Sequence, residues 1–396
     1  MVAVIFILVV LCFFPAVAAQ NRSTSLQHFD KLAAQAAQAR DANQIDEAIA
    51  LYRQALRLRP QWDEGWFYLA TLLYEGDSWA DASQAFKEAT NLNPKVGTAW
   101  VMLGLCEFKL GRFKDALEHI QQGRRLGTPA EPQFNYVMLY HEGILLLGKG
   151  DFERAQETLG LLSSDGVETE DLTTALGLSV LRVRFSDLLA GDSALRQLVL
   201  RAGWAEHLAA QKKFGEALSE YERLATDFPK APNVQYAYGR FLIVSNQDEK
   251  AIAAFKREID NTANHLLARL WIADIKFRLK DFAGALPFAE DVVKLSPQMP
   301  LGHFLLGALL LGTGQTARAI TELETAQKSL PNEPKIYFQL GRAYASANRK
   351  EDAARARATF TRLSEHVEVR AKSGEQDQHS EAAKEKPSSA VKPGRP

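Results

Sequence analysis

Residues 66–104 read WFYLATLLYEGDSWADASQAFKEATNLNPKVGTAWVMLG and contain one pattern twice: a tryptophan, then a leucine followed by a small residue. Trp66 opens the first copy and Trp100 opens the second. Between them, apolar residues recur at intervals of three and four, which is typical of amphipathic helices. Pro94 has no N–H to donate and therefore ends the second of two such helices. The stretch predicts a pair of helices that repeats along the chain.

The spacing of 34 residues between Trp66 and Trp100 recurs over most of the sequence. Alanines separated by this period, which we call the anchor alanines, form two series with Ala155 between them. Ala or Gly stands twelve residues before each anchor alanine. Small side chains at both points would let the backbones of two helices approach each other, so these positions are candidates for the crossing point of each pair. The anchor alanines are Ala48, Ala82, Ala116, Ala155, Ala217, Ala251, Ala285, Ala319 and Ala353, and the upstream residues are Ala36, Ala70, Gly104, Gly143, Ala205, Gly239, Ala273, Gly307 and Gly341.

The series of small residues at this period, which we call the ladder, resembles the tetratricopeptide repeat family. The signature of that family is a Trp, Leu-Gly, Tyr, Ala, Phe, Ala, Pro series with a period of about 34 residues. Trp66, Leu69-Ala70, Ala82, Phe86, Ala89 and Pro94 match it most fully. The resemblance covers about residues 26–363 and implies an all-α fold, a right-handed tetratricopeptide α-solenoid of about nine repeats interrupted by one extra helix. Departures occur where Arg201, Gln235, Arg269 and His303 replace the opening aromatic residue, and where Arg357 replaces the aromatic residue after the last anchor.

The spacing of the anchors sets the expected domain organisation. Ala155 and Ala217 stand almost two periods apart, and the excess holds an apolar-periodic stretch with acids at its start, which predicts one additional helix near 169–190. We therefore expect an N-terminal repeat block (26–163), an inserted helix and linker (164–192) and a C-terminal repeat block (193–363). Residues 364–396 are rich in Lys, Glu, Ser and Pro and form a predicted disordered tail.

Residues 1–19 predict export. An uninterrupted apolar run is followed by Pro15 and the small residues Ala16-Val17-Ala18-Ala19, as in a secretory signal peptide cleaved after Ala18 or Ala19. No basic residue precedes the run, which departs from that pattern. The expected location is periplasmic or secreted, and the alternative is an uncleaved N-terminal membrane anchor.

Composition and motifs argue against several functions. A formal net charge of -1 disfavours nucleic-acid binding, and two cysteines cannot form a disulfide framework. No local metal-ligand cluster, phosphate-binding loop or nucleophile motif is complete, so we expect no catalytic residue, no metal and no cofactor. Cys106 is predicted to be buried and inert, and His141-Glu142 is interpreted as a surface or groove pair.

The resemblance implies that the first helix of each pair lines a concave side, where a groove would bind a partner. Two interpretations of the corresponding face remain open: its aromatic residues pack on neighbouring helices, or part of them stays exposed to a peptide or helix. The predicted partner-binding groove residues are Phe67, Tyr74, Val101, Leu105, Phe108, Tyr140, Tyr236, Arg240, Phe304, Phe338 and Arg342.

The expected function is a non-catalytic scaffold of an exported protein that binds a protein or peptide partner in this groove. A self-associating assembly module is the alternative, and an enzyme with dispersed catalytic residues is a third. Membrane contact is expected only through an uncleaved leader.

Overall fold

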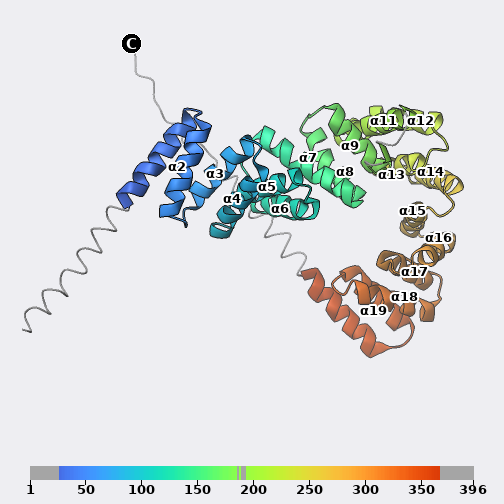
Figure 1. The fold of residues 1–396 in the computed structure, drawn as a ribbon. Helices are drawn as coiled ribbons and strands as arrows, with labels where there is room; N and C mark the ends of the chain where they lie inside the picture. The colour runs from blue at the N-terminus through green and yellow to red at the C-terminus, as the bar shows by residue number, and fades with distance from the viewer. Residues whose placement is uncertain (1–25, 185–186, 189–192, 366–396) are drawn as a thin grey trace, which may run out of the picture. The chain divides into compact units, whose positions relative to one another are not determined.

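The computed structural model describes residues 26–184, 187–188 and 193–365, and all regular secondary structure in these ranges is helical (Figure 1). Residues 26–41 and 350–365 are helical at the two ends of this region. The predicted signal peptide and almost all of the predicted tail lie outside it. The helices with defined bounds are α2 (Ile45–Leu58), α3 (Asp63–Glu75), α4 (Trp79–Leu92), α5 (Gly97–Lys109), α6 (Phe113–Leu126), α7 (Pro132–Lys149), α8 (Phe152–Ser164), α9 (Glu170–Val180), α11 (Ser193–Ala210), α12 (Phe214–Asp227), α13 (Val234–Val244), α14 (Asp248–Asn261), α15 (Leu266–Arg278), α16 (Phe282–Leu295), α17 (Pro300–Gly312), α18 (Thr316–Ser329) and α19 (Pro334–Ser346).

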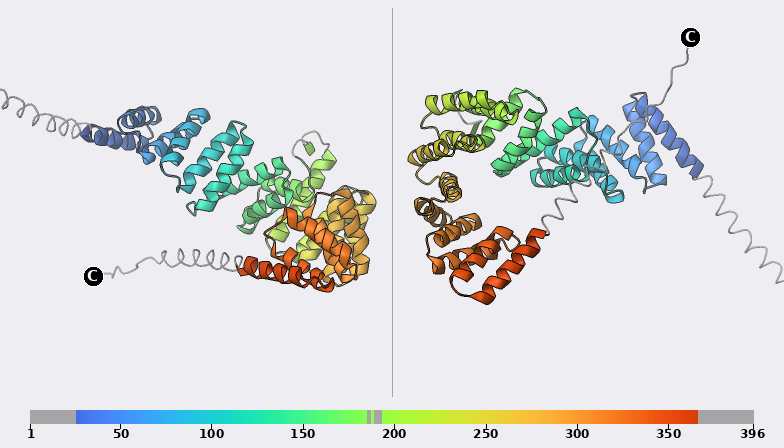
Figure 2. Two further views of the ribbon diagram at one scale, coloured as in Figure 1. Left: turned by 90° about the horizontal axis from the view of Figure 1, so that it is seen from below. Right: turned by 180° about the vertical axis from the view of Figure 1, so that it is seen from behind.

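The chain forms two compact units, Met1–Leu224 and Ala225–Pro396. Within each unit, helices pack mainly on those next to them in sequence, and each hairpin pairs a first helix with a second (Figures 1 and 2). Stacked hairpins of this kind agree with the predicted all-α repeat fold. The predicted repeat blocks 26–163 and 193–363 stay a prediction.

The turn inside each hairpin has the same conformation in all nine repeats. The residue five positions before each anchor alanine has a positive φ, between 56° and 81°. Around it the chain makes the 6→1 backbone bond of a Schellman turn, as from the N–H of Arg112 to the carbonyl of Glu107 at 2.8 Å. Asn, Asp and Gly tolerate this backbone region, and seven of the nine positions carry one of them. The nine residues are Asn43, Asp77, Gly111, Gly150, Lys212, Asn246, Lys280, Gly314 and Asn348.

The helices of each pair cross where the small residues predicted it. All nine anchor alanines are fully buried. A Cβ added to Gly104 would lie 2.8 Å from the carbonyl oxygen of Ala116, and one added to Gly307 would lie 3.2 Å from that of Ala319. These distances leave little or no room for a larger side chain, which explains why every one of these positions holds Ala or Gly.

The opening position of a repeat holds the preceding loop by a hydrogen bond. The indole Nε1 of Trp66 and of Trp100 each donates at 2.9 Å to the carbonyl of the proline six residues earlier, Pro60 and Pro94. His303, which departs from the aromatic pattern, makes the same contact through Nε2 with the carbonyl of Pro297 at 2.9 Å. This departure therefore preserves the interaction with a different donor.

The extra helix α9 packs closely on α11 at two glycines. A Cβ on Gly177 would lie 1.9 Å from the carbonyl oxygen of Val199, and one on Gly203 would lie 1.8 Å from that of Thr173. The second helix α8 also reaches α11, because the hydroxyl of Ser164 donates to the carbonyl of Ala210 at 3.1 Å. α9 is thus built into the first unit by contacts with both α8 and α11.

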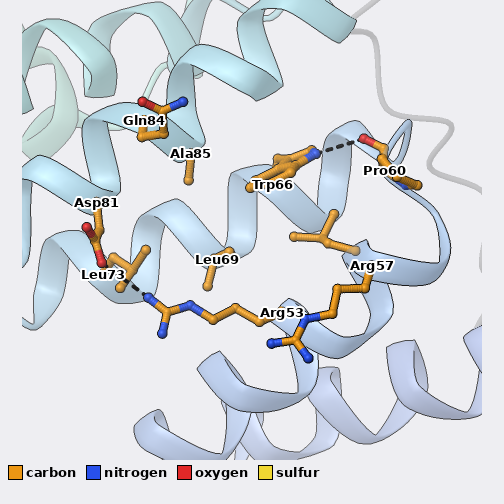
Figure 3. A pocket seen from close by; sticks show the side chains of 10 residues that line it. Arg53, Arg57, Pro60, Trp66, Leu69, Leu73, Asp81, Gln84 and Ala85 are labelled. Carbon is orange, nitrogen blue, oxygen red and sulfur yellow. Dashed lines mark hydrogen bonds and ion pairs between the residues drawn. The ribbon is translucent and has the colours of Figure 1, made fainter.

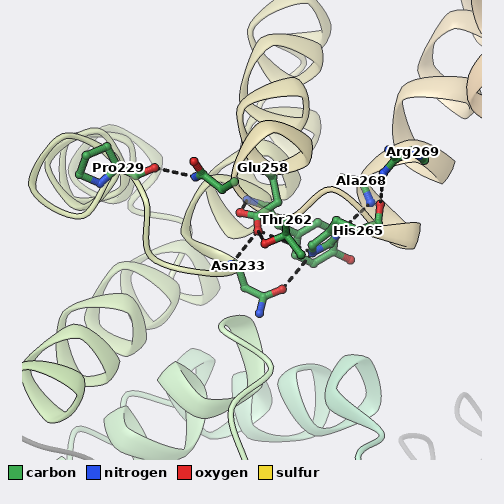
Figure 4. A network of polar contacts seen from close by, with 9 residues as sticks. Pro229, Asn233, Glu258, Thr262, His265, Ala268 and Arg269 are labelled. Atoms are coloured by element: carbon green, nitrogen blue, oxygen red, sulfur yellow. Dashed lines mark hydrogen bonds and ion pairs between the residues drawn. The ribbon is translucent and has the colours of Figure 1, made fainter.

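A buried carboxyl group joins α14 to the start of α13 (Figure 4). Glu258 on α14 has no exposed surface and accepts hydrogen bonds from the backbone N–H groups of Asn233 at 3.0 Å and Tyr236 at 3.2 Å. A negative group at this place satisfies N–H groups that have no partner inside the helix. Nearby, His265 accepts from the N–H of Ala268 through Nδ1, so its Nε2 donates to Oδ1 of Asn233 at 3.0 Å.

Candidate protein-interaction surface

Three of the predicted groove residues belong to the core. Val101, Leu105 and Tyr236 are buried, and the ring of Tyr236 packs on Phe255 and His265 at centroid distances of 5.9 and 4.9 Å. Of the two interpretations that the sequence left open for this face, packing on neighbouring helices holds at these three positions. The three are packing residues, and their assignment to the groove was wrong.

Four aromatic rings meet on α5 and α7 in the first unit. The rings of Phe108 and Tyr140, both predicted, each pack edge-on against His141, with centroids 4.8 and 5.9 Å from the imidazole. Tyr136, one helical turn before Tyr140, stacks on it at 5.7 Å with an angle of 13° between the rings. All four side chains are half-buried. We call Phe108, Tyr136, Tyr140 and His141 the aromatic cluster.

The electrostatics of the aromatic cluster favour its neutral form. Burial raises the pKa of Tyr140 to about 12, and the nearby carboxyl group of Asp171 and the phenol of Tyr136 add to this effect. Burial lowers the pKa of His141, and Lys109 lowers it further, although the hydrogen bond to the Val137 carbonyl opposes the change. At neutral pH these shifts keep the phenol of Tyr140 and the imidazole of His141 uncharged, and uncharged aromatic faces suit apolar side chains.

Acidification is expected to destabilise the first unit through His141. Its pKa is lower in the folded than in the unfolded chain, so the unfolded chain takes up the proton first as pH falls below about 6.5. The contribution of His141 to stability is complete above that value and is lost as pH falls toward the folded pKa. Urea unfolding at pH 7.5 and 5.5 should show a smaller loss for His141→Phe, which keeps an aromatic ring, than for the unchanged chain. Equal losses in the two proteins would contradict this role.

His141 and Glu142 were expected to form a surface or groove pair, but their side chains lie in different environments. Glu142 is buried and accepts hydrogen bonds from Arg124 at 2.9 Å and Gln121 at 3.1 Å, which join α7 to α6. The Nδ1 of His141 donates to the Val137 carbonyl at 2.7 Å. Adjacent residues on a helix point in directions about 100° apart, so the two side chains serve different interfaces.

Phe67 and Tyr74 of α3 are half-buried and lie partly in the core. The ring of Phe67 packs edge-on against Phe86 of α4 at 5.7 Å. Burial raises the pKa of Tyr74, with Cys106 and Asp77 as further causes. The thiol of Cys106 is itself buried, and burial raises its pKa to about 12. The sequence prediction of a buried, unreactive thiol agrees with this environment.

The second unit leaves an aromatic residue and a cation open at α19. Phe338 is 48% exposed, packs on Phe360 at 5.5 Å and lies 6.0 Å from the exposed guanidinium of Arg342. Phe304 is half-buried against the core of α18 and α19. Arg240 is half-buried and already has an interaction partner within the protein. The predicted residues of this unit are thus spread over several helices rather than gathered.

Tyr136 and Phe360 complete these groupings and were not predicted from the sequence. The spacing of Tyr136 and Tyr140, four residues apart on one helix, was a usable signal for the first of them.

Within residues 26–184, 187–188 and 193–365, no group of three His, Cys, Asp or Glu side chains has the arrangement of a metal site. In the same residues, no helix has the length and apolar character needed to cross a membrane.

Family models agree with this architecture. The model described as a tetratricopeptide repeat matches residues 208–273 and 276–337, and a second model with the same description matches 249–300. The model described as "Anaphase-promoting complex, cyclosome, subunit 3" matches residues 41–123. The chain carries tetratricopeptide repeats. Its fold is accordingly the tetratricopeptide α-solenoid that the ladder of small residues predicts.

Several known proteins are similar over long stretches of these tetratricopeptide repeats. "BBSome complex member BBS4" of Bos taurus is 23% identical over 322 residues, which are 78% of this chain and 60% of the relative. "Anaphase-promoting complex subunit 3" of Schizosaccharomyces pombe is 27% identical over 141 residues, 34% of this chain and 21% of the relative. This chain therefore spans three fifths or less of these relatives.

Among solved structures, MamA residues 41 to the end from Desulfovibrio magneticus RS-1 aligns with a TM-score of 0.39 and 24% identity. The alignment covers 43% of this chain and 96% of that one.

Proposed function

We propose that this protein is a non-catalytic scaffold whose aromatic cluster binds an apolar helix or peptide of a partner protein. The observation that carries the proposal is the meeting of Phe108, Tyr136 and Tyr140 as half-buried rings on neighbouring first helices. Aromatic side chains that are anchored on one side and accessible on the other dominate the energetics of many protein interfaces. The names of two relatives, a BBSome complex member and an anaphase-promoting complex subunit, describe components of assemblies.

Tyr140→Ala is expected to lower the affinity for the native partner at least about tenfold, the effect of losing an interface anchor. Capture from the native source, quantified by mass spectrometry against the unchanged chain, measures this loss. Phe214→Ala is a matched control, because Phe214 is 45% exposed at the start of α12 and lies outside the cluster. Helicity and the unfolding midpoint of both variants must match the unchanged protein. Undiminished capture by folded Tyr140→Ala would refute this site.

Self-association is a second candidate, favoured by the exposed aromatic surface of Phe338 beside Phe360. Light scattering over a range of concentrations distinguishes the two functions. A measured mass equal to that of one chain at every concentration argues against self-association and agrees with the scaffold proposal. A mass that rises with concentration, and is lower in Phe338→Ala, supports self-association.

We also propose export, with removal of the leader near Ala18 or Ala19, because the apolar run followed by small residues fits a signal peptide. Sequencing the N-terminus of the protein from its native source is expected to begin at Ala19 or Gln20. A chain that still begins at Met1 contradicts cleavage and favours the anchored alternative.

A further inference from the structure

A pocket of about 490 Å³ lies between α2, α3 and α4, away from the aromatic cluster (Figure 3). α2 and α4 are second helices of neighbouring repeats, α3 is a first helix, and all three contribute to the lining. On α3 the pocket uses Trp66, Leu69 and Leu73, which point roughly 120° away from the Phe67 and Tyr74 face. The pocket and the predicted groove are therefore different surfaces of the same unit.

The floor of the pocket is apolar and firmly held. Leu56, Leu69, Leu73 and Ala85 line it and are each buried in the core of the first unit. The indole N–H of Trp66 is already engaged with the Pro60 carbonyl at 2.9 Å, so the ring presents carbon atoms to the pocket. A volume of this size accepts one or two large side chains, and its apolar lining would remove part of their surface from water.

The rim of the pocket carries an excess of positive charge. Arg53 pairs with Asp81 at 3.2 Å, which leaves Arg57 as the remaining charged group of the lining. Among the residues that the structure describes, none forms a hydrogen bond or ion pair with the guanidinium of Arg57. In Figure 3 the two guanidinium groups lie on the same side of the pocket, opposite Trp66. A guanidinium at the edge of an apolar hollow pairs best with a carboxylate, because its fork of N–H donors matches the two oxygens.

We propose that this pocket binds a partner peptide in which a large apolar side chain stands next to an acidic residue. The apolar side chain fills the hollow over Leu69 and Leu73, and the carboxylate contacts Arg57. This site is separate from the aromatic cluster, so the protein would hold partners through two surfaces of its first unit.

The test is a fluorescence anisotropy titration of the full chain with a fluorescein-labelled peptide, Gly-Phe-Glu-Leu-Glu-Phe-Gly, at low salt. Arg57→Glu is expected to weaken binding at least about tenfold, and a peptide with Lys in place of both Glu residues should bind more weakly by a similar factor. Gln84→Trp, which narrows the pocket from the exposed side of α4, should also weaken binding. Arg362→Glu is the matched control, since it makes the same charge change at an exposed position in the other unit.

The result is independent of the aromatic cluster, because Tyr140→Ala should leave peptide binding unchanged while lowering capture of the native partner. The pocket proposal is overturned if the unchanged chain does not bind the acidic peptide, if the Lys peptide binds as well, or if Arg57→Glu has no effect. A photo-crosslinking residue at Gln84 tests the other occupants. Crosslinks to residues 1–25 or 366–396 of the same chain, or to a second copy, would show that the pocket is already filled and would also overturn it.

Discussion

Glu258→Ala is expected to lower the free energy of unfolding of the second unit by about 2–4 kcal/mol, since it leaves buried N–H groups without an acceptor. In the network of Figure 4 its carboxyl group accepts from the N–H groups of Asn233 and Tyr236 and from the hydroxyl of Thr262 at 3.3 Å. Glu258 is completely buried and its bond with the N–H of Tyr236 is buried too, so water does not readily replace the carboxyl group at that donor. Alanine would leave both the start of α13 unsatisfied and a cavity on α14.

Urea unfolding followed by circular dichroism measures this effect. Glu258→Gln keeps an acceptor oxygen and should lose less stability than the alanine variant. Glu249→Ala is the control on the same helix, because Glu249 is exposed in the first turn of α14 and should change stability by less than about 0.5 kcal/mol. If Glu258→Ala is as stable as Glu249→Ala, the carboxyl group does not hold the helix start.

Gly177→Ala is expected to destabilise the first unit by about 3 kcal/mol or more, because one added methyl group would overlap backbone. Its Cβ would lie 1.9 Å from the carbonyl oxygen of Val199, an atom that cannot rotate away. α9 and α11 would have to separate, which also pulls Gly203 away from Thr173. On helix propensity alone, the same change would stabilise the helix by about 1 kcal/mol.

Gly160→Ala makes the same chemical change without the steric overlap. Its Cβ would lie 3.8 Å from that of Ala210, an ordinary contact, in the middle of α8. This variant should be as stable as the unchanged chain or more so. Thermal unfolding of both variants gives the comparison, and a Gly177→Ala midpoint equal to that of Gly160→Ala would contradict the close crossing of α9 and α11.

The sequence was sufficient for the repeat architecture because the same steric demand recurs in every hairpin. A crossing of two helices admits only Ala or Gly at its centre, so the constraint is written into the chain once per repeat. The departures from the aromatic pattern were harder to interpret. His303 looks like a loss of the signature, yet it supplies the same N–H donor to a proline carbonyl, a role that depends on geometry and not on residue class.

The candidate surface was only partly predictable, because a helical wheel gives the direction of a side chain but not what covers it. Val101 and Tyr140 occupy equivalent positions, yet the first is buried and the second is half-buried.

Glu258 was not singled out from the sequence, although its position in the repeat carried a signal. Glu258 stands seven residues after its anchor alanine, Ala251. The same position after other anchors holds a buried apolar residue, such as Leu162, Val292 or Ala326, so a glutamate there indicates a specific polar contact.

The left-handed turn inside every hairpin restricts where this chain can change length. Twelve residues always separate the two small residues of a pair, whereas the step between anchors exceeds one period from Ala116 to Ala155 and again from Ala155 to Ala217. All the extra length, including α9, has therefore been added at the joints between hairpins. These joints are the places at which a foreign loop, a tag or a new helix can be inserted while every crossing stays intact, and a single residue added beside Gly111 would rotate one helix off its partner by about 100°.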